Sequence, residues 1–258
     1  MALIAMAVHD TEENGRSEFT IDTIASISKT VDTDKNRIII INNCSDWNVD
    51  IAAELLASGK NKPLVINLSE NIGTARAINL AIQQRRPGEH VIKIDNDVVI
   101  HQKGWVERLE ECVEREPRIG QVGLKRKDLW ETPWHEIPGN RCELMMLPHE
   151  PGQRWILVEK SRHIMGTCVL HSSALLDKVG YMYQPGVYGY DDTIMSCRAN
   201  VAGFITCFLS HIEIDHIDPG GTDYIKWKQR EAGVYQSEVL DLMKKYVSGE
   251  KPVYHEFY

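Results

Sequence analysis

Short apolar runs alternate with amphipathic segments along the first half of the chain. Uninterrupted runs rich in Ile and Val are typical of strands that are buried on both faces of a parallel sheet. Apolar residues spaced three or four apart are typical of helices that cover such a sheet. The runs begin near residues 3, 37, 64 and 91, and the helical segments span residues 19–30, 49–58, 74–85 and 105–116. This alternation predicts an α/β fold with a parallel, doubly wound sheet.

Two carboxylates interrupt the fourth apolar run, VIKIDNDVVI at residues 91–100. An ionised carboxylate is costly to bury without a partner. Ligands of doubly wound sheets bind beyond the carboxyl ends of the strands, and Asp95 and Asp97 fall where the fourth strand is expected to end. Two carboxylates separated by one residue offer oxygen ligands to Mg²⁺ or Mn²⁺. They equally suit a solvated turn that opens the next loop, and the spacing alone does not decide between the two.

Polar residues also follow the third apolar run, in the stretch NIGTARAIN at residues 71–79. Asn71 is suited to cap a helix, and Gly73 lets the backbone come close to a neighbour. A helix N-terminus with Arg76 nearby suits a diphosphate. The same pattern also suits a capped, tightly packed helix without a ligand.

Two more polar groups lie in the second half of the chain. Asp191 and Asp192 are adjacent before a helical segment, where the helix dipole favours negative charge. His216 leaves a strand-like run just before a glycine-rich turn, although a lone histidine is more often structural than a ligand. Residues 129–163 show no clean period and are too long for a plain connector, which predicts a functional or lid-like segment. A C-terminal helix is expected around residues 236–246.

Composition and charge narrow the class of protein. The 258 residues suit one large domain, and the formal charge of 29 − 37 = −8 argues against general attraction to nucleic acid or anionic lipid. Two basic clusters, at residues 125–127 and 226–230, run against that average. Six scattered cysteines without a C-x-x-C pair predict reduced thiols. No basic leader precedes the apolar N-terminus and no run reaches the ~18 apolar residues of a membrane span, so we expect a cytoplasmic protein.

Taken in order, these groups resemble the family 2-like glycosyltransferases of the GT-A fold, which use nucleotide-sugar donors. The resemblance covers roughly residues 1–125 and 164–220, and residues 129–163 have no counterpart. The motifs that carry it are ALIAMAV, RIIIINNCSD, N-x-G-x-A-x-A-x-N at 71–79, the DxD motif at 95–97, Asp191-Asp192, Arg198, Gly203-Phe204 and His216.

The resemblance implies a GT-A (Rossmann-like), mostly parallel sheet flanked by helices, with an acceptor-side insertion, in one structural domain. Residues 1–128 would form the donor-binding half, residues 129–163 an insertion or lid, and residues 164–258 the acceptor-binding and catalytic half. It also implies a reaction, the metal-dependent transfer of a sugar from a nucleoside diphosphate to an acceptor hydroxyl, with inversion. The expected cofactor is Mn²⁺ or Mg²⁺, and the expected acceptor is a glycan or a small hydroxylated molecule.

The resemblance also implies roles for single residues. Asp97 and His216 would ligate the metal beside Asp95, which would face the ribose and the sugar. Asp192 would act as general base, with Asp191 beside it in the acceptor site. The implied donor-binding residues are Asn42, Asn71, Gly73, Arg76 and Asp95.

Two further expectations concern the base and the acceptor. Asn42 stands where the family commonly has an aspartate for the nucleotide base, and an amide both donates and accepts, so the base stays open. The tryptophans of the insertion are expected to pack on an acceptor, and they are Trp130, Trp134 and Trp155.

Three alternatives stay open on sequence alone. An apolar strand followed by D-x-D-V also resembles the nucleophile motif of haloacid dehalogenase phosphatases and phosphotransferases, although that motif usually lies on the first strand. A non-catalytic sugar-nucleotide-binding protein would fit the altered base-binding residue. A hydroxylated base in DNA is a further candidate acceptor, because the two basic clusters include Trp227, which could stack on a base.

Overall fold

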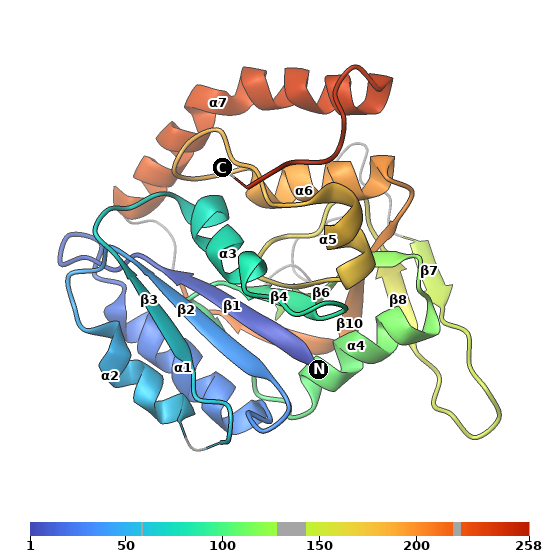
Figure 1. Ribbon diagram of the computed structural model, residues 1–258, viewed down its shortest axis with the longest axis horizontal. Coiled ribbons are helices and arrows are strands. Elements are labelled where there is room, and N and C mark those ends of the chain that lie inside the picture. Colours follow the sequence, from blue (N-terminus) through green and yellow to red (C-terminus); the bar gives the residue numbers. More distant parts are fainter. Residues whose placement is uncertain (58, 128–142, 219–222, 258) are drawn as a thin grey trace.

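One sheet runs through the middle of the computed structural model, with helices on both of its faces (Figure 1). The structure describes residues 1–57, 59–127, 143–218 and 223–257. The strands are β1 (Ala2–Val8), β2 (Arg37–Asn43), β3 (Leu64–Leu68), β4 (His90–Ile94), β5 (Val98–Val99), β6 (Ile119–Arg126), β7 (Glu143–Met146), β8 (Leu157–Lys160), β9 (Cys168–His171) and β10 (Ile205–His216). The helices are α1 (Ser17–Thr30), α2 (Val49–Ala53), α3 (Thr74–Gln83), α4 (Trp105–Arg115), α5 (Ser173–Val179), α6 (Asp191–Val201) and α7 (Asp223–Ser248).

The strand order confirms the α/β class predicted from the sequence. Strands follow each other as β3-β2-β1-β4-β9-β6-β10-β8-β7, and β5 pairs with β10. The first four of these strands are parallel, as the apolar runs predict. Beyond β4 the sheet is mixed. β9 is antiparallel to both of its neighbours, β4 and β6, whereas β6 and β10 run parallel to each other. The sheet is therefore all parallel on the side of the first half and mixed on the other side.

Alternate residues of the central strands feed two separate cores. In β1, Ile4 and Met6 belong to the core under α1, α2 and α4, and Leu3 and Ala5 belong to the core under α3, α5 and α6. Successive side chains of a strand point to opposite faces, so a strand covered by helices on both sides has no solvent-facing set of positions that favours polar residues. This is why the first half of the sequence shows continuous apolar runs.

Several element boundaries differ from the sequence prediction. The helix predicted at 49–58 ends at Ala53 and continues as one 3₁₀ turn, Glu54–Leu56. The C-terminal helix α7 already begins at Asp223 and so includes the basic cluster at 226–230. The described part of the predicted insertion forms an antiparallel hairpin, β7–β8, at the edge of the sheet.

A buried arginine helps to hold the C-terminal tail, residues 249–257, against the rest of the protein. Arg198 on α6 is fully buried and donates to the carbonyl oxygens of Val253 at 2.7 Å, Tyr181 at 2.8 Å and Val179. A planar guanidinium can serve three carbonyl groups at once, which no lysine can do with the same geometry. Among the described residues, no helix is both long and apolar enough to cross a membrane.

We predict that Arg198→Met lowers the free energy of unfolding by about 3 kcal/mol, because it removes the donor shared by three carbonyl groups, although that of Val179 still accepts from the N–H of His255. The midpoint of thermal unfolding should fall by roughly 10 °C. Thermal denaturation followed by circular dichroism measures this shift. Lys244→Met on the exposed side of α7 is the control and should change little. Equal midpoints for the two variants would show that the guanidinium does not hold the tail.

Candidate active site

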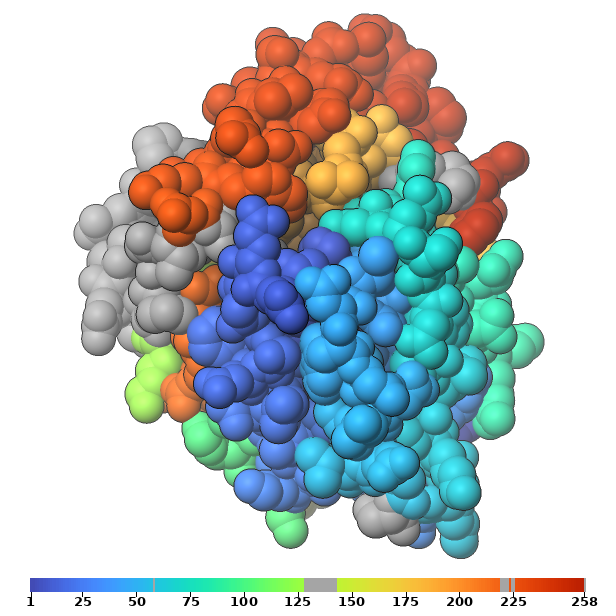
Figure 2. Space-filling model, turned by 90° about the vertical axis from the view of Figure 1, so that its left-hand side faces the viewer, coloured from blue at the N-terminus to red at the C-terminus, as the bar shows by residue number. Residues whose placement is uncertain are grey.

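A cavity of about 240 Å³ opens at the carboxyl ends of β1 and β4. Its walls come from both halves of the chain, since they include the DxD motif, the segment Met165–Thr167, the first turn of α6 and α7. Figure 2 shows this side of the molecule, where α7 in orange meets the blue segment after β1 and the yellow segment before α6. The position matches the rule that ligands of such sheets bind beyond the strand ends.

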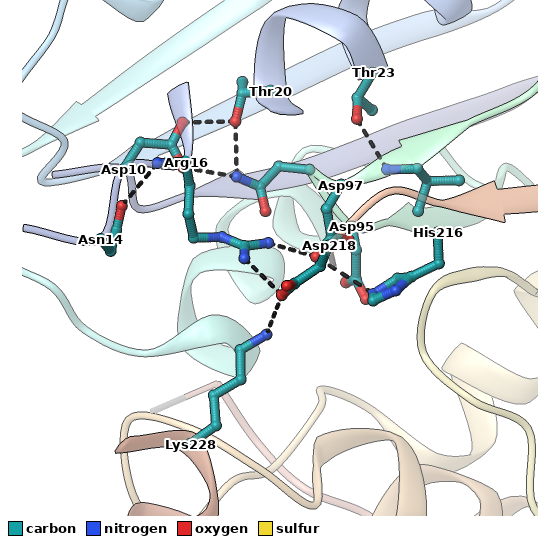
Figure 3. A network of polar contacts seen from close by, with 12 residues as sticks. Asp10, Asn14, Arg16, Thr20, Thr23, Asp95, Asp97, His216, Asp218 and Lys228 are labelled. Carbon is teal, nitrogen blue, oxygen red and sulfur yellow. Dashed lines mark hydrogen bonds and ion pairs between the residues drawn. The ribbon is translucent and has the colours of Figure 1, made fainter. Parts of the chain in front are cut away.

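The DxD motif lies in a turn between β4 and β5 that α1 holds in place. Asn96, the middle residue, donates to Asp10 at 2.8 Å and to Thr20 at 2.7 Å. Thr20 in turn donates to Asp10 at 2.6 Å (Figure 3). Thr23 accepts from the N–H directly after the motif at 2.9 Å. With Asn96 anchored in this way, Asp95 and Asp97 both line the cavity.

Asp97 is the most strongly paired carboxylate of the site. It is buried, forms an ion pair with Arg16, and lies 3.4 Å from Nε2 of His216. Burial acts to raise the pKa of Asp97, but His216, Arg16 and Lys228 outweigh that effect and hold it below its usual range. In the described part of the chain, Oδ1 of Asp97 is buried without a hydrogen-bond partner. His216 reaches this position because β10 pairs with β5, where it faces Val98.

The basic clusters of the sequence do not form one exposed basic face. Lys125 is buried against Glu159 at 2.8 Å, whereas Arg126 lines the cavity. Lys228 also lines the cavity and lies 3.5 Å from Asp218, which accepts from Arg16 at 2.7 Å. Each cluster therefore supplies one cation to the cavity. Lys226 and Arg230 are exposed and line a neighbouring cavity with Trp227, and DNA as the acceptor stays a prediction.

Lys93 is a functional candidate that sequence reasoning missed. Its ammonium donates to Asp95 at 2.8 Å and to the carbonyl oxygen of Gly166 at 2.8 Å, and it lies 3.5 Å from Asp191. Burial acts to lower the pKa of Lys93, but the charges of Asp95 and Asp191 outweigh it, so the pKa lies above its usual value. Burial raises the pKa of both carboxyls. The available signal was a lysine inside an otherwise apolar run.

Asp192 is the more exposed member of the second acidic pair, with 26% of its side chain accessible. Its carboxylate accepts from the N–H of Gly166 at 3.1 Å and lies 3.7 Å from Nε2 of His163. Asp191 is buried, and its Oδ2 has no hydrogen-bond partner among the described residues. Both line the cavity, so the structure brings all four acidic residues predicted from the sequence to one place.

The predicted donor-binding residues are only partly gathered there. Asn42 is engaged elsewhere, because its amide donates to Asn67 at 2.8 Å and accepts from Ser45 at 2.9 Å. The next residue, Asn43, lines the cavity instead and donates to Asn71 at 2.8 Å. Arg76 is exposed on α3 and is not among the lining residues.

The start of α3 packs against the second half of the chain, and its first residue, Thr74, also lines the cavity. Gly73, not Asn71, is the N-cap residue, with φ at +85°. A Cβ added there would lie 3.0 Å from the Cα of Val187. The N–H of Ala75 donates to the side chain of Gln184 at 2.9 Å. Gly73 thus allows a close approach between two segments of the protein.

The three tryptophans assigned to the acceptor remain predictions. Trp130 and Trp134 lie outside the described residues. Trp155 is 64% exposed between β7 and β8, and its ring contacts that of His149 at a centroid distance of 3.3 Å. It does not line the cavity, so only an acceptor that extends beyond the cavity would reach it.

Asp97 and His216 would suit a divalent metal whose remaining ligands come from the substrate and water. Within the described ranges, no group of three or more His, Cys, Asp or Glu side chains could hold a metal ion. Two neighbouring candidate ligands are present, however, since Oδ1 of Asp97 has no hydrogen-bond partner among the described residues, Nε2 of His216 lies 3.4 Å from Oδ2 of Asp97, and both side chains line the cavity. Mg²⁺ is typically held by one or two carboxylates together with phosphates and water, and Mn²⁺ accepts both oxygen and imidazole ligands.

Comparison with known proteins adds a family and a fold. The family model of glycosyl transferase family 2 matches residues 13–180, more than half of the chain. No curated protein sequence matches. The fold is similar to that of S. aureus TarS 1-349, at 16% identity with a TM-score of 0.59, over 85% of this chain and 61% of that one.

Two further solved structures have similar folds. The mannosyltransferase PcManGT from Pyrobaculum calidifontis, in complex with GDP-Man and Mn²⁺, matches at 14% identity with a TM-score of 0.64, over 88% of this chain and 59% of that one. GalNAc-T7 with UDP, GalNAc and Mn²⁺ matches at 13% identity with a TM-score of 0.60, over 84% of this chain and 43% of that one. This chain therefore spans about three fifths or less of the length of these proteins. The GT-A fold predicted from the sequence is confirmed.

We predict that Gly73→Ala destabilises the protein because of both its backbone angle and its close neighbour. Gly203 has a similar φ of +89° with no atom near an added Cβ, so Gly203→Ala measures the backbone strain alone. Strain of this kind costs roughly 1–3 kcal/mol, and Gly73→Ala should cost at least about 1 kcal/mol more. Urea denaturation of both variants measures the difference. Equal losses would mean that Val187 moves away freely.

Proposed function

Because the chain belongs to glycosyl transferase family 2, we propose that it transfers a sugar from a nucleoside diphosphate to an acceptor hydroxyl, with a divalent metal and with inversion. The observation that carries the proposal is the single cavity shared by the DxD carboxylates, His216 and Asp192. A transferase must bring the donor and the acceptor base within reach of one another. Neither the phosphatase alternative nor the non-catalytic one gains support from the family match.

The donor end of the cavity is suited to a diphosphate. Solved structures with a similar fold hold GDP-Man or UDP-GlcNAc, which supports a nucleotide sugar as the donor here. Arg16, Arg126 and Lys228 line the cavity and provide positive charge for phosphate oxygens. Asp97 and His216 would hold Mn²⁺ or Mg²⁺, which neutralises charge on a departing diphosphate.

The acceptor end is suited to general-base chemistry. Asp192 is the carboxylate at this end that is open to an incoming hydroxyl, with its Oδ2 oriented by the N–H of Gly166. It would take the proton of the acceptor hydroxyl as that oxygen attacks the anomeric carbon opposite the diphosphate. Oδ2 of Asp191, which lies 3.5 Å from Nζ of Lys93 and has no hydrogen-bond partner among the described residues, would accept a second hydroxyl of the acceptor and fix its orientation.

We predict that Asp97→Asn removes the Mn²⁺-dependent stabilisation by the cognate nucleoside diphosphate, because one anionic metal ligand is lost. The measurement is a thermal-shift panel of nucleoside diphosphates with and without Mn²⁺. A ligand at ~100 times its dissociation constant adds about 2.7 kcal/mol, which corresponds to a shift of roughly 5–10 °C. Asp192→Asn is the control and should keep the shift. An unchanged shift in Asp97→Asn would remove this residue from the metal site.

We predict that Asp192→Asn retains donor binding but loses transfer by roughly 10²–10⁴-fold, because the amide cannot take a proton. Steady-state rates on an identified acceptor test the loss, and NMR of the product tests the stereochemistry. The product should carry the anomeric configuration opposite to that of the donor. A retained configuration would contradict Asp192 as base even if the protein proves to be a glycosyltransferase.

A further inference from the structure

Lys93 occupies an unusual position on the central strand β4. It lies on the sheet face that packs against α3, α5 and α6, in register with the small residue Ala5 on β1. Its side chain is buried, with 5% accessible, and its ammonium lies at the carboxyl end of the strand. There it contacts one group of the donor half, Asp95, and two of the acceptor half, Gly166 and Asp191.

We propose that Lys93 is a positioning residue that couples the donor half of the site to its catalytic half. This rests on the function proposed above, since it assigns Asp95 to the donor and Asp192 to the acceptor. The ammonium fixes Asp95 directly and holds Asp191 by charge. It also fixes the backbone of Gly166, whose carbonyl oxygen accepts from Lys93 and whose N–H, in the preceding peptide group, donates to Asp192.

The charges of the site require such a cation. Lys93 forms the only ion pair of Asp191 within the described residues. A buried carboxylate that loses its cation takes up a proton or moves towards water. Without Lys93, Asp95 and Asp191 would repel each other across the space between the two acidic motifs.

Gly166 packs closely against the ammonium of Lys93. A Cβ on Gly166 would lie 2.6 Å from Nζ of Lys93 and 3.2 Å from the Cβ of Asp192. Only glycine leaves room for Lys93 and Asp192 to approach the backbone of this one residue at the same time. Gly166→Ala should therefore displace the ammonium while the lysine itself is retained.

The first experiment is chemical rescue. After the cognate donor is identified, transfer and the slower hydrolysis of the donor by water are followed with Mn²⁺ present. Lys93→Ala should lose about 10²-fold or more in kcat, as expected when reacting groups shift by ~1 Å, while the donor KM changes much less. Propylammonium chloride, which replaces the missing atoms, should raise the kcat of Lys93→Ala at least about tenfold, and the increase should saturate with its concentration.

Two controls separate this role from a general structural one. Sodium chloride at the same ionic strength should restore nothing. Lys125→Ala removes another buried lysine, paired with Glu159 away from the cavity, and should lower stability while kcat is kept. No rescue by propylammonium, or an equal loss of kcat in Lys125→Ala, would overturn the proposal.

The second experiment needs no activity and so distinguishes the proposal from the proposed function. Lys93→Met should lower the thermal midpoint by roughly 10 °C, and the added change Asp191→Asn should recover at least about half of this, because the buried charge is removed. Additive shifts would overturn the coupling. Absence of any nucleotide-sugar binding by the wild-type protein would overturn the proposed function instead.

If Lys93→Ala does not fold, Gly166→Ala serves in its place. It should lose transfer by about 10²-fold while the donor still binds. Gly233→Ala on α7, where an added Cβ meets nothing, is the matched control and should be silent. Full activity of Gly166→Ala would overturn the proposal.

Discussion

The need to neutralise buried carboxylates governs the site and the part of the fold around it. Asp97 and Asp191 are buried and Asp95 is half-buried at one edge of the sheet. Charges in such a place must be paired, and each of these residues has a cation within 3.5 Å. Those cations come from the start of α1 and from β4, and Lys228 on α7 adds a further positive charge that helps to lower the pKa of Asp97.

Much of the first half could be predicted from the sequence, for a physical reason. Strands buried on both faces give continuous apolar runs, and those runs predicted β1 to β4 and their parallel order. The second half gave weaker signals because β7 and β8 lie at the edge of the sheet, where Leu144, Met146 and Leu157 are exposed among polar residues. The same mixture of polar and exposed positions concealed the start of α7, which lies over the cavity.

The sequence revealed the carboxylates that line the cavity but not the cations that pair with them. Acidic pairs at strand and helix ends are visible as motifs, whereas Arg16 and Lys93 are single residues whose role depends on contacts distant in sequence. Asn43, and not the predicted Asn42, lines the cavity, which shows a related limit. Adjacent residues of a strand face opposite sides, and a run buried on both sides does not reveal which side faces the cavity.

The direction of β9 explains how the two halves come to share one cavity. In a parallel pair, the strand next to β4 would end, not begin, beside the DxD motif. Because β9 is antiparallel, its first residue, Cys168, lies opposite Ile94, and the segment just before it reaches the carboxyl edge of the sheet. That segment contains Gly166, which thereby meets Lys93 and Asp192 at once. One antiparallel strand inserted beside a parallel sheet is therefore what brings the DxD edge of the sheet together with Asp192 in this chain.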